Sequence, residues 1–281
     1  MDLIPHLQTS FKDVKLIFII PFRNRETHLN VFSTFMKYIM EDYKENEVLY
    51  LVCNQKDTRP FNRGAMKNLG FMISKYLFPE RYKEITFVFH DIDTMPSRKN
   101  MISYETEEKK IKHFYGFQFA LGGIFSIQGK DFEDVGGFPN IWGWGYEDNI
   151  IQSRVIEKKM TIDRSQFYVC GHTDIAQLQH GKKRVIDQKV IYKVNTWMEH
   201  SYFYDIKNIE YTVRPMDLNT QCFYLDFIGW NIPQRYEDIE FRMEVPKPKL
   251  TQFKFDMRTI LRKQYEKNAK YMRKPMNRRY R

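Results

Sequence analysis

Hydrophobic and polar positions follow two different rhythms in the first ninety residues of this chain. Three short apolar runs, at Lys15–Phe22, Val48–Cys53 and Ile85–His90, have the length and composition of buried strands. The stretches between them, Thr27–Tyr43 and Asn62–Phe78, carry apolar residues at helical spacing. Strand, helix, strand, helix, strand in this order predicts an α/β domain with a mostly parallel central sheet.

The second half of the chain has a less regular pattern, with aromatic-rich segments of β character after about residue 200. We place a main domain at residues 1–205 and a C-terminal extension with a basic helical tail at residues 206–281. The expected elements are extended chain around Phe114–Ile127 with a tight bend at Gly122–Gly123, a helix at Tyr146–Lys158, a short strand at Ile175–Gln179 and a helix at Phe253–Met272.

Composition adds that a chain of 281 residues, 42% hydrophobic and 16% aromatic, can bury a core, which excludes wholesale disorder. The three cysteines have no metal-ligand spacing and are too few for a disulfide framework, so a reducing compartment is expected. No segment approaches the ~18 uninterrupted apolar residues of a membrane span. The N-terminal residues lack the pattern of a signal peptide.

The formal net charge of +10 is concentrated at the C-terminus. Residues Lys254–Arg281 hold eleven basic and two acidic residues, and Tyr265, Tyr271 and Tyr280 are interleaved with them. Basic and aromatic residues in this arrangement are typical of segments that bind nucleic acid. Contact with an anionic surface and a simple solvated helix are the alternatives.

Charged side chains follow the three predicted strands at the points where the strands end. Asp91 and Asp93 stand two residues apart and point the same way in extended chain, which suits a hard divalent cation. The alternative is an Asx-turn that closes the strand. Arg23, Arg25 and Arg63 could pair with phosphates, or they are ordinary solvated surface. Parallel strands would bring all five side chains to one crevice, which favours a diphosphate–metal site.

Another candidate for chemistry is the stretch FPNIWGWGYEDNI, at Phe138–Ile150. Glu147 and Asp148 begin a predicted helix, so one of them could be a general base, or both could compensate the helix dipole. The Trp–Gly loop before them supplies aromatic faces that suit sugar rings. His180 follows a short apolar segment and is a candidate ligand, with His172 as its competitor and a structural histidine as the alternative.

Taken together, seven motifs occur in the order that the β-1,4-galactosyltransferase family (glycosyltransferase family seven) shows, and over residues 14–185 the chain resembles that family. The motifs are PFRNR at Pro21–Arg25, FNR at Phe61–Arg63, DID at Asp91–Asp93, GG at Gly122–Gly123, GFPN at Gly137–Asn140, WGWGYED at Trp142–Asp148, and His180 followed by basic residues.

The resemblance implies a GT-A (Rossmann-like) fold that binds a UDP-sugar and Mn²⁺, with Mg²⁺ as the alternative metal. It implies inverting transfer of a hexose, galactose or N-acetylhexosamine, to a hydroxyl of a glycan or glycoconjugate acceptor. The loop at residues 181–192 would close over the donor. The donor-binding residues it implies are Pro21, Phe22, Arg23, Arg25, Phe61, Arg63, Asp91, Ile92, Asp93, Ala120, Gly122, Gly123, Trp144 and His180.

The resemblance also assigns the metal and the acceptor. Asp93 and His180 would ligate Mn²⁺, Glu147 would orient the acceptor, and Asp148 would be the catalytic base. The implied acceptor-binding residues are Trp142, Gly145, Tyr146, Glu147 and Asp148.

Three departures from the family's pattern bear on specificity. Tyr146, Asn149 and Ile150 interrupt the usual WGWGGEDDD run, which alters the acceptor side of the site. Gln177 stands where galactosyltransferases of the type branch have Met, three residues before the metal histidine. Ala120 replaces an aromatic residue that crowds the donor sugar, so we expect room for a bulkier donor such as an N-acetylhexosamine.

The family's eukaryotic members carry an N-terminal membrane anchor that this sequence does not show. We therefore expect a soluble protein, cytoplasmic in a microbe or virus, or in the Golgi lumen if the sequence is a truncated eukaryotic enzyme. Two rival functions are kept: a catalytically weak sugar- or nucleotide-binding pseudoenzyme, and a nucleic-acid or anionic-surface binder through the tail.

Overall fold

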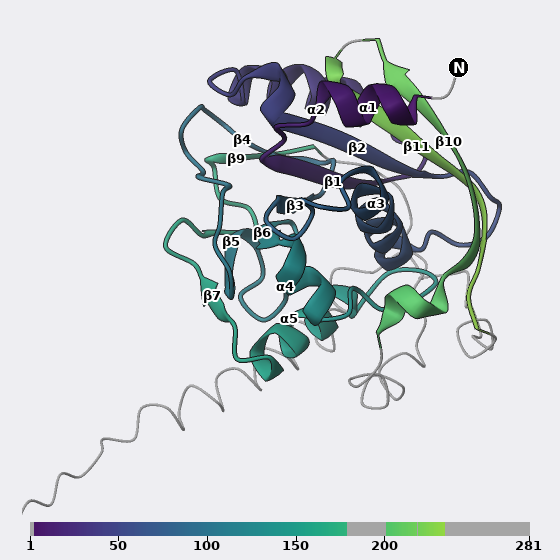
Figure 1. Cartoon of the computed structure of the whole chain (residues 1–281). Coiled ribbons are helices and arrows are strands. Elements are labelled where there is room, and N and C mark those ends of the chain that lie inside the picture. The colour runs from purple at the N-terminus through teal and green to yellow at the C-terminus, as the bar shows by residue number, and fades with distance from the viewer. Residues whose placement is uncertain (1–2, 179–200, 218, 234–281) are drawn as a thin grey trace, which may run out of the picture. The chain divides into compact units, whose positions relative to one another are not determined.

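The computed structural model describes residues 3–178, 201–217 and 219–233 (Figure 1). All of them belong to one compact unit of the chain. The candidate ligand His180, the neighbouring Gln179, the expected loop at 181–192 and the expected basic helix at Phe253–Met272 lie outside the described residues.

Nine of the described strands form one sheet, in the order β10-β11-β2-β1-β3-β6-β5-β7, with β8 beside β5 (Figure 1). The four central strands β11, β2, β1 and β3 run parallel, whereas β10 and β6 pair antiparallel at their two sides. This confirms the expected α/β class with a mostly parallel sheet. The strands are β1 (Leu16–Phe22), β2 (Val48–Gln55), β3 (Thr86–His90), β5 (Lys110–Gly116), β6 (Ile124–Gln128), β7 (Thr161–Asp163), β8 (Tyr168–Val169), β10 (Lys207–Met216) and β11 (Asn219–Asn231).

Helices cover both faces of this sheet, which explains why the central strand β1 is apolar and buried at every position. Along β1, Ile17 and Ile19 pack in the cluster that contains α1 and α3, while Leu16, Phe18 and Ile20 pack in the cluster that contains α2. Alternate side chains of a strand point to opposite faces, so one apolar run contributes to both cores. The helices are α1 (Ile4–Ser10), α2 (Glu26–Ile39), α3 (Arg63–Leu77), α4 (Gly129–Asp134) and α5 (Glu147–Glu157), with short 3₁₀ turns at η1 (Glu45–Glu47) and η3 (Tyr202–Asp205).

Helix α3 starts at the edge of the sheet where the site is expected, and local chemistry fixes that start. Asn62 caps the helix: its side-chain oxygen accepts the backbone N–H of Ala65 at 2.9 Å. Gly64 in the first turn allows close approach of the chain at Pro139, because a β-carbon there would lie 2.1 Å from the Pro139 carbonyl oxygen. The first turn of α3 is therefore packed directly against the GFPN motif.

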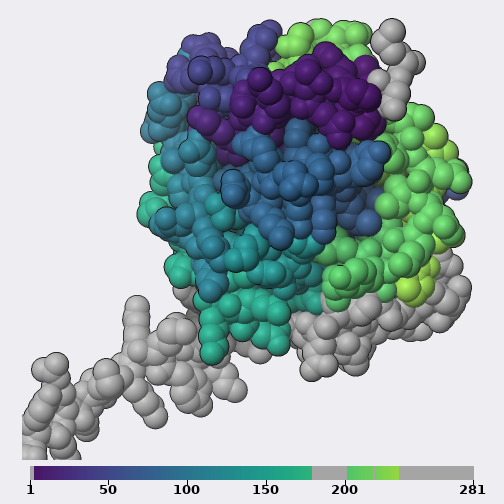
Figure 2. Space-filling model, viewed as in Figure 1, coloured from purple at the N-terminus to yellow at the C-terminus, as the bar shows by residue number. Residues whose placement is uncertain are grey.

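The hairpin β10–β11 lies beyond the domain boundary expected at residue 205, yet it extends the main sheet. Strand β11 pairs parallel with β2 from Cys222 opposite Tyr50 to Phe227 opposite Gln55. Just before the hairpin, η3 contacts α3, and Figure 2 shows the green surface of this segment against the blue surface of the helix. Pairing with β11 satisfies the backbone N–H and C=O groups of β2 that would otherwise form an open edge.

A small second sheet holds the segment after β3. In it, β4 (Thr94–Pro96) pairs antiparallel with β9 (Ile175–Gln177), and Thr94 stands opposite Gln177. This pairing brings the chain around residue 177 back to the DID motif. Among the described helices none is long and apolar enough to cross a membrane.

Candidate active site

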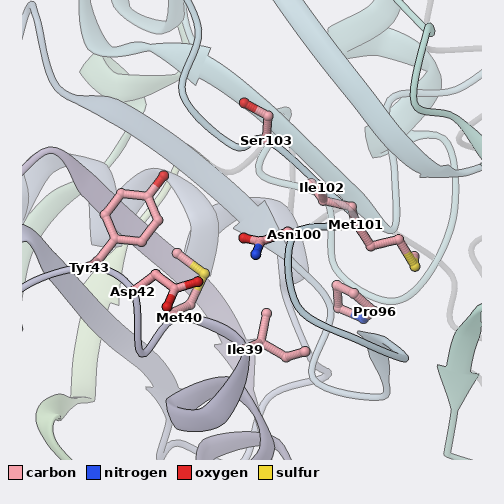
Figure 3. A pocket seen from close by; sticks show the side chains of 9 residues that line it. All are labelled: Ile39, Met40, Asp42, Tyr43, Pro96, Asn100, Met101, Ile102 and Ser103. Carbon is pink, nitrogen blue, oxygen red and sulfur yellow. The ribbon is translucent and has the colours of Figure 1, made fainter.

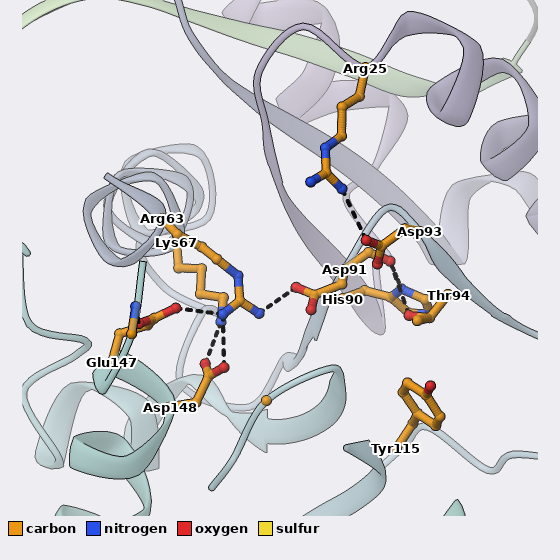
Figure 4. Close-up of polar contacts among 12 residues, drawn as sticks. Arg25, Arg63, Lys67, His90, Asp91, Asp93, Thr94, Tyr115, Glu147 and Asp148 are labelled. Atoms are coloured by element: carbon orange, nitrogen blue, oxygen red, sulfur yellow. Dashed lines mark hydrogen bonds and ion pairs between the residues drawn. The ribbon is translucent and has the colours of Figure 1, made fainter. Parts of the chain in front are cut away.

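Charged residues from four separate segments meet beyond the carboxyl ends of the parallel strands (Figure 4). Arg25 follows β1, Arg63 begins α3 after β2, and Asp91 and Asp93 follow β3. The N-terminus of α5 brings Glu147 and Asp148 to the same place. Of the five side chains that the strand-end argument placed in one crevice, Arg25, Arg63, Asp91 and Asp93 form ion pairs at this edge of the sheet, whereas Arg23 bonds to the loop after β2.

Arg63 is the centre of this cluster. Its Nη1 donates to Glu147 Oε1 at 2.6 Å and to Asp148 Oδ2 at 2.8 Å, and its Nη2 donates to Asp91 Oδ1 at 2.5 Å. Burial alone would lower the pKa of Arg63, but the three carboxylates outweigh it and raise that pKa well above its ordinary value. One guanidinium thus links the end of β3 to the start of α5.

Asp148 is held by two cations, one on each carboxylate oxygen. Besides Arg63 on Oδ2, Lys67 donates from Nζ to Oδ1 at 3.0 Å. Burial raises the pKa of Asp148, but the positive charges of Arg63 and Lys67 overcome that effect and lower it below its ordinary value. Asp148 is therefore a carboxylate at neutral pH, and it can accept a proton.

The two acids face the cluster because of how α5 begins. Gly145 has φ +126°, and Tyr146, the N-cap, is left-handed with φ +67°, so the chain turns sharply into the helix. The backbone N–H of Gly145 donates to Glu147 Oε2 at 3.0 Å. Glu147 and Asp148 also stand in the first turn, where negative charge is favoured by the helix dipole. The geometry is thus compatible with both interpretations of this pair, compensation of the helix dipole and a general base.

The GG pair forms the turn between β5 and β6 that lies beside these carboxylates. Gly123 has φ +71°, and a β-carbon on it would lie 2.4 Å from the Tyr115 carbonyl oxygen. Its own carbonyl accepts the backbone N–H of Asp91 at 2.9 Å. Ala120, two residues before Gly122, is buried. The turn between β5 and β6 thus connects to the DID motif.

Asp93 lies on the other side of the DID motif from the Arg63 cluster (Figure 4). Its Oδ2 accepts from Arg25 Nη1 at 3.0 Å. Its backbone carbonyl accepts the N–H of Leu178, two residues before His180, at 2.7 Å. Nearby, Tyr115 donates its hydroxyl to Gln177 Oε1 at 3.2 Å, which gives the unusual Gln177 a partner. Gln177 thus faces the tyrosine through its side-chain amide.

Of the two metal ligands that the resemblance implies, Asp93 lies among the described residues and His180 does not. Asp93 offers the carboxylate oxygens that hard cations prefer. Within residues 3–178, 201–217 and 219–233, no group of three His, Cys, Asp or Glu side chains could hold an ion. His172, the competing histidine, accepts the backbone N–H of Asp174 at its Nδ1 and stacks edge-on with Tyr168.

Of the other residues expected at the donor side, one bonds to a neighbouring loop and the rest are buried or partly buried. Arg23 donates to the backbone carbonyls of Arg59 and Asp57, in the loop after β2. Phe22 packs edge-on against Tyr224 of β11. The remaining members are buried or partly buried beside the strand ends: Pro21, Phe61 and Ile92.

The two tryptophans of the WGWG loop have different surroundings. Trp142 is 2% exposed; the Arg59 guanidinium lies 4.5 Å from its ring centroid, and Trp230 of β11 stacks beside it. Arg59 also lies 4.4 Å over Trp230, so one cation serves both rings. Trp144 is 37% exposed. Trp142, expected in the acceptor site, is therefore a packing residue in this structure, and Trp144 presents the accessible ring.

The motifs did not point to Lys67, Arg59 or Trp230. Lys67 lies four residues after Arg63 in a helical pattern, and that spacing places both on one helix face. The spacing was visible in the sequence, but an isolated lysine in a helix is usually solvated. Trp230 lies far along the chain from Trp142, and nothing local links them.

A pocket of about 300 Å³ lies elsewhere, at the end of α2, and shares no residue with the carboxylate cluster (Figure 3). It is lined by Ile39, Met40, Asp42, Tyr43, Pro96, Asn100, Met101, Ile102 and Ser103.

Comparison with known proteins agrees with the motifs. The profile described as the N-terminal region of glycosyl transferase group 7 matches residues 8–106, and the one described as the N-terminal domain of galactosyltransferase matches residues 103–182. Beta-1,4-galactosyltransferase 6 of Rattus norvegicus is 28% identical over 208 residues, which cover 70% of this chain and 52% of the relative. Beta-1,4-galactosyltransferase 1 of Mus musculus is 31% identical over 159 residues, 53% of this chain and 39% of the relative. The matched part of the chain thus spans about half or less of these relatives.

Solved structures give the same fold. The catalytic domain of Drosophila β-1,4-galactosyltransferase 7 in complex with xylobiose superposes with a TM-score of 0.65 at 21% identity, covering 79% of this chain and 96% of that one. A mutant of that enzyme in complex with manganese, UDP-Gal and xylobiose gives a TM-score of 0.66 at 20% identity, with the same coverage. The sheet described above is thus a GT-A fold. Two adjoining profiles match in chain order over residues 8–182, and the fold agrees, so this chain belongs to the β-1,4-galactosyltransferase family, glycosyltransferase family seven.

Proposed function

We propose that this chain is an inverting, Mn²⁺-dependent glycosyltransferase that moves a hexose from a UDP-sugar to a hydroxyl group of a sugar acceptor. The observation that carries the proposal is the junction at Arg63, which places the candidate base Asp148 next to Asp91 at the end of β3. In a GT-A fold the nucleotide is expected at the carboxyl ends of the strands. The base and the donor site would then adjoin.

In the proposed donor site, arginines bind the diphosphate and the DID motif contributes to metal binding. Arg25 and Arg63 can donate to the oxygens of a diphosphate, for which they would exchange some of their present carboxylate partners. Asp93 and His180 would hold the metal, and the hydrogen bond from Leu178 to the Asp93 carbonyl supports this pairing because it brings the chain before His180 to Asp93. A bound Mn²⁺ supplies neutralisation of the charge that develops on the departing diphosphate. The manganese and UDP-Gal in the Drosophila enzyme's complex support the choice of metal and nucleotide.

Asp148 acts as the base in the proposed reaction. The acceptor hydroxyl loses its proton to Asp148 as its oxygen bonds to the anomeric carbon, while the bond from that carbon to the UDP oxygen breaks. Attack from the face opposite the leaving group inverts the configuration, and no covalent intermediate with the protein forms. Glu147, already held by Arg63 and by the N–H of Gly145, orients the acceptor.

A sugar ring is the proposed acceptor because the accessible ring of Trp144 stands in the loop that leads into the two acids. Aromatic rings suit the apolar faces of sugars. The Drosophila relative was solved with xylobiose, which supports a saccharide acceptor. Tyr146, at the N-cap of α5, is partly buried against the core and sets this chain apart from the usual WGWGG loop.

The test is a donor-by-acceptor screen in the presence of Mn²⁺, with Asp148→Asn as the diagnostic variant. Asp148→Asn should retain UDP binding and lose transfer by roughly 10²–10⁴-fold, the usual contribution of a general base. Asp134→Asn, an exposed carboxylate in α4, is the matched control and should retain full activity. Undiminished turnover of Asp148→Asn would remove Asp148 from the mechanism.

Two outcomes distinguish the rival functions. UDP and Mn²⁺ binding without transfer to any acceptor in the screen would favour the sugar- or nucleotide-binding pseudoenzyme. Binding of nucleic acid or anionic vesicles that disappears when residues 254–281 are deleted would assign a separate binding role to the basic tail, which lies outside the described residues.

A further inference from the structure

Lys67 is a buried lysine aimed at the candidate base. It is 1% exposed, although it stands in the second turn of α3. Its Nζ lies 3.0 Å from Asp148 Oδ1 and 4.2 Å from the centroid of the Phe138 ring. The hydrogen bond and the cation–π contact leave the charge paired, which a buried ammonium requires.

Lys67 and Arg63 reach Asp148 from the same helix face, because they are four residues apart. Arg63 divides its donors among Asp91, Glu147 and Asp148. Lys67, by contrast, makes its ion pair with Asp148 alone among the residues that the structure describes. If a diphosphate draws Arg63 away, Lys67 is the cation that stays with Asp148.

We propose that Lys67 is a positioning residue that fixes the orientation and the ionised state of Asp148 for proton abstraction. The inference rests on the proposed function of Asp148 as the base. Lys67 itself transfers no proton and touches no substrate. Lys67 occupies one lone pair of Oδ1 and Arg63 one of Oδ2, which leaves one lone pair on each oxygen for the acceptor hydroxyl.

The charged and titratable groups around Asp148 come from four parts of the fold. Arg63 and Lys67 lie on α3, and Asp91 follows β3. Glu147 is the residue before Asp148 on α5, and His113 lies on β5. Burial lowers the pKa of His113 to about 4, so His113 is neutral at pH 7. Asp91 and Glu147 are like charges that oppose ionisation of Asp148. The two cations on α3 therefore control its charge.

Removal of the Lys67 charge should raise the pKa of Asp148. A base must be ionised, so activity falls as the pH drops through its pKa. In Lys67→Met, an unbranched side chain of similar length, the acidic limb of the kcat/KM profile should move to higher pH. Looser placement of the carboxylate should also lower kcat by roughly 10- to 100-fold while KM for the donor stays unchanged.

The matched control is Lys75→Met, two turns further along α3. Lys75 forms an ion pair with Glu133, is partly exposed, and does not reach the cluster. This variant should keep the wild-type pH profile and kcat. A second variant, Lys67→Gln, keeps a hydrogen-bond donor for Oδ1 but not the charge, and it should shift the acidic limb as Lys67→Met does.

A readout independent of turnover separates this inference from the proposed function. The carboxyl ¹³C resonance of Asp148, assigned with Asp148→Asn, reports its titration directly. In folded Lys67→Met and Lys67→Gln it should titrate at higher pH than in the wild type, even if no acceptor is ever found. An unchanged titration in both variants, with only a lower melting temperature, would show that Lys67 is merely structural and overturn the inference.

Discussion

Asp148 occupies the space in which a side chain on Gly122 would lie. A β-carbon built on Gly122 would stand 2.3 Å from Asp148 Oδ2, and the N–H of Leu121 donates to the Asp148 carbonyl at 2.9 Å. The GG turn and the start of α5 thus fit each other without spare volume. The position of the candidate base depends on the absence of a side chain on the strand-connecting turn.

Gly122→Ala should displace the Asp148 carboxylate. Because Arg63 and Lys67 hold both oxygens, the carboxylate cannot move without weakening one of these pairs. Misplacement of a catalytic group by about 1 Å can cost 10²-fold, so we expect roughly that loss of kcat. Steady-state kinetics measure the loss, and a thermal melt checks that the variant is folded.

Gly229→Ala is the control for the glycine substitution. A β-carbon there would lie 3.6 Å from Glu210 Oε2, which is an ordinary contact. This variant should keep the wild-type kcat. Full activity in Gly122→Ala would show that the Asp148 carboxylate is not tied to its present position.

Ala120 should set the choice of donor sugar. Ala120 is buried before the GG pair, and its methyl group takes up less volume than the aromatic side chain found there in the type branch. We expect the wild-type protein to transfer an N-acetylhexosamine as well as galactose, and Ala120→Tyr to restrict it to galactose. The ratio of kcat/KM values for the two UDP-sugars measures this. Transfer from UDP-galactose alone by the wild type would contradict the argument.

His90 and His113, the two buried histidines among the described residues, should make the fold sensitive to acid. Burial lowers the pKa of both His90 and His113 from 6.5 to about 4, and Arg164 adds repulsion at His113. The unfolded chain therefore binds more protons between pH 6.5 and 4, so stability is full above pH 6.5 and falls as the pH drops through this window. The loss on full titration is about 3 kcal/mol for each histidine.

Urea unfolding between pH 7.5 and 5 tests this dependence. Burial and the positive charge of Arg164, which donates to His113 Nδ1, lower the pKa of His113 and hold it neutral, although the carbonyls of Tyr115 and Gly122 at its Nε2 act in the opposite direction. In His113→Gln the free energy of unfolding should fall less steeply with decreasing pH than in the wild type. The exposed His6→Gln should keep the wild-type slope. Equal slopes in all three proteins would mean that His113 is not held neutral.

The local pattern of the sequence determined the elements of the α/β core. Apolar runs such as Lys15–Phe22 became β1 because a strand buried on both faces must be apolar at every position. Helical spacing over Asn62–Phe78 predicted α3, and Tyr146–Lys158 predicted α5, each to within a residue. These are short-range signals: side-chain periodicity and capping act within a few residues.

Tertiary structure decided which of the motif residues meet and which do not. Trp142 and Trp144 stand in one repeated dipeptide, yet Trp142 is buried because Arg59 and the distant Trp230 cover it. Strand β11, expected in an extension, joins the sheet because the edge of β2 needed a partner. Neither result follows from neighbours in the sequence, since both depend on pairing across long stretches of chain.

The chemistry of the site divides in the same way. The sequence by itself determined that acids and arginines stand at strand ends and at the start of a helix, because motif order and periodicity are written in the chain. Only the fold decided that Arg63 and Lys67 both hold Asp148, and that Gly122 leaves the space for it. Charge pairing and close packing are set by distances in space, and the chain order of residues 63, 67, 122 and 148 does not contain those distances.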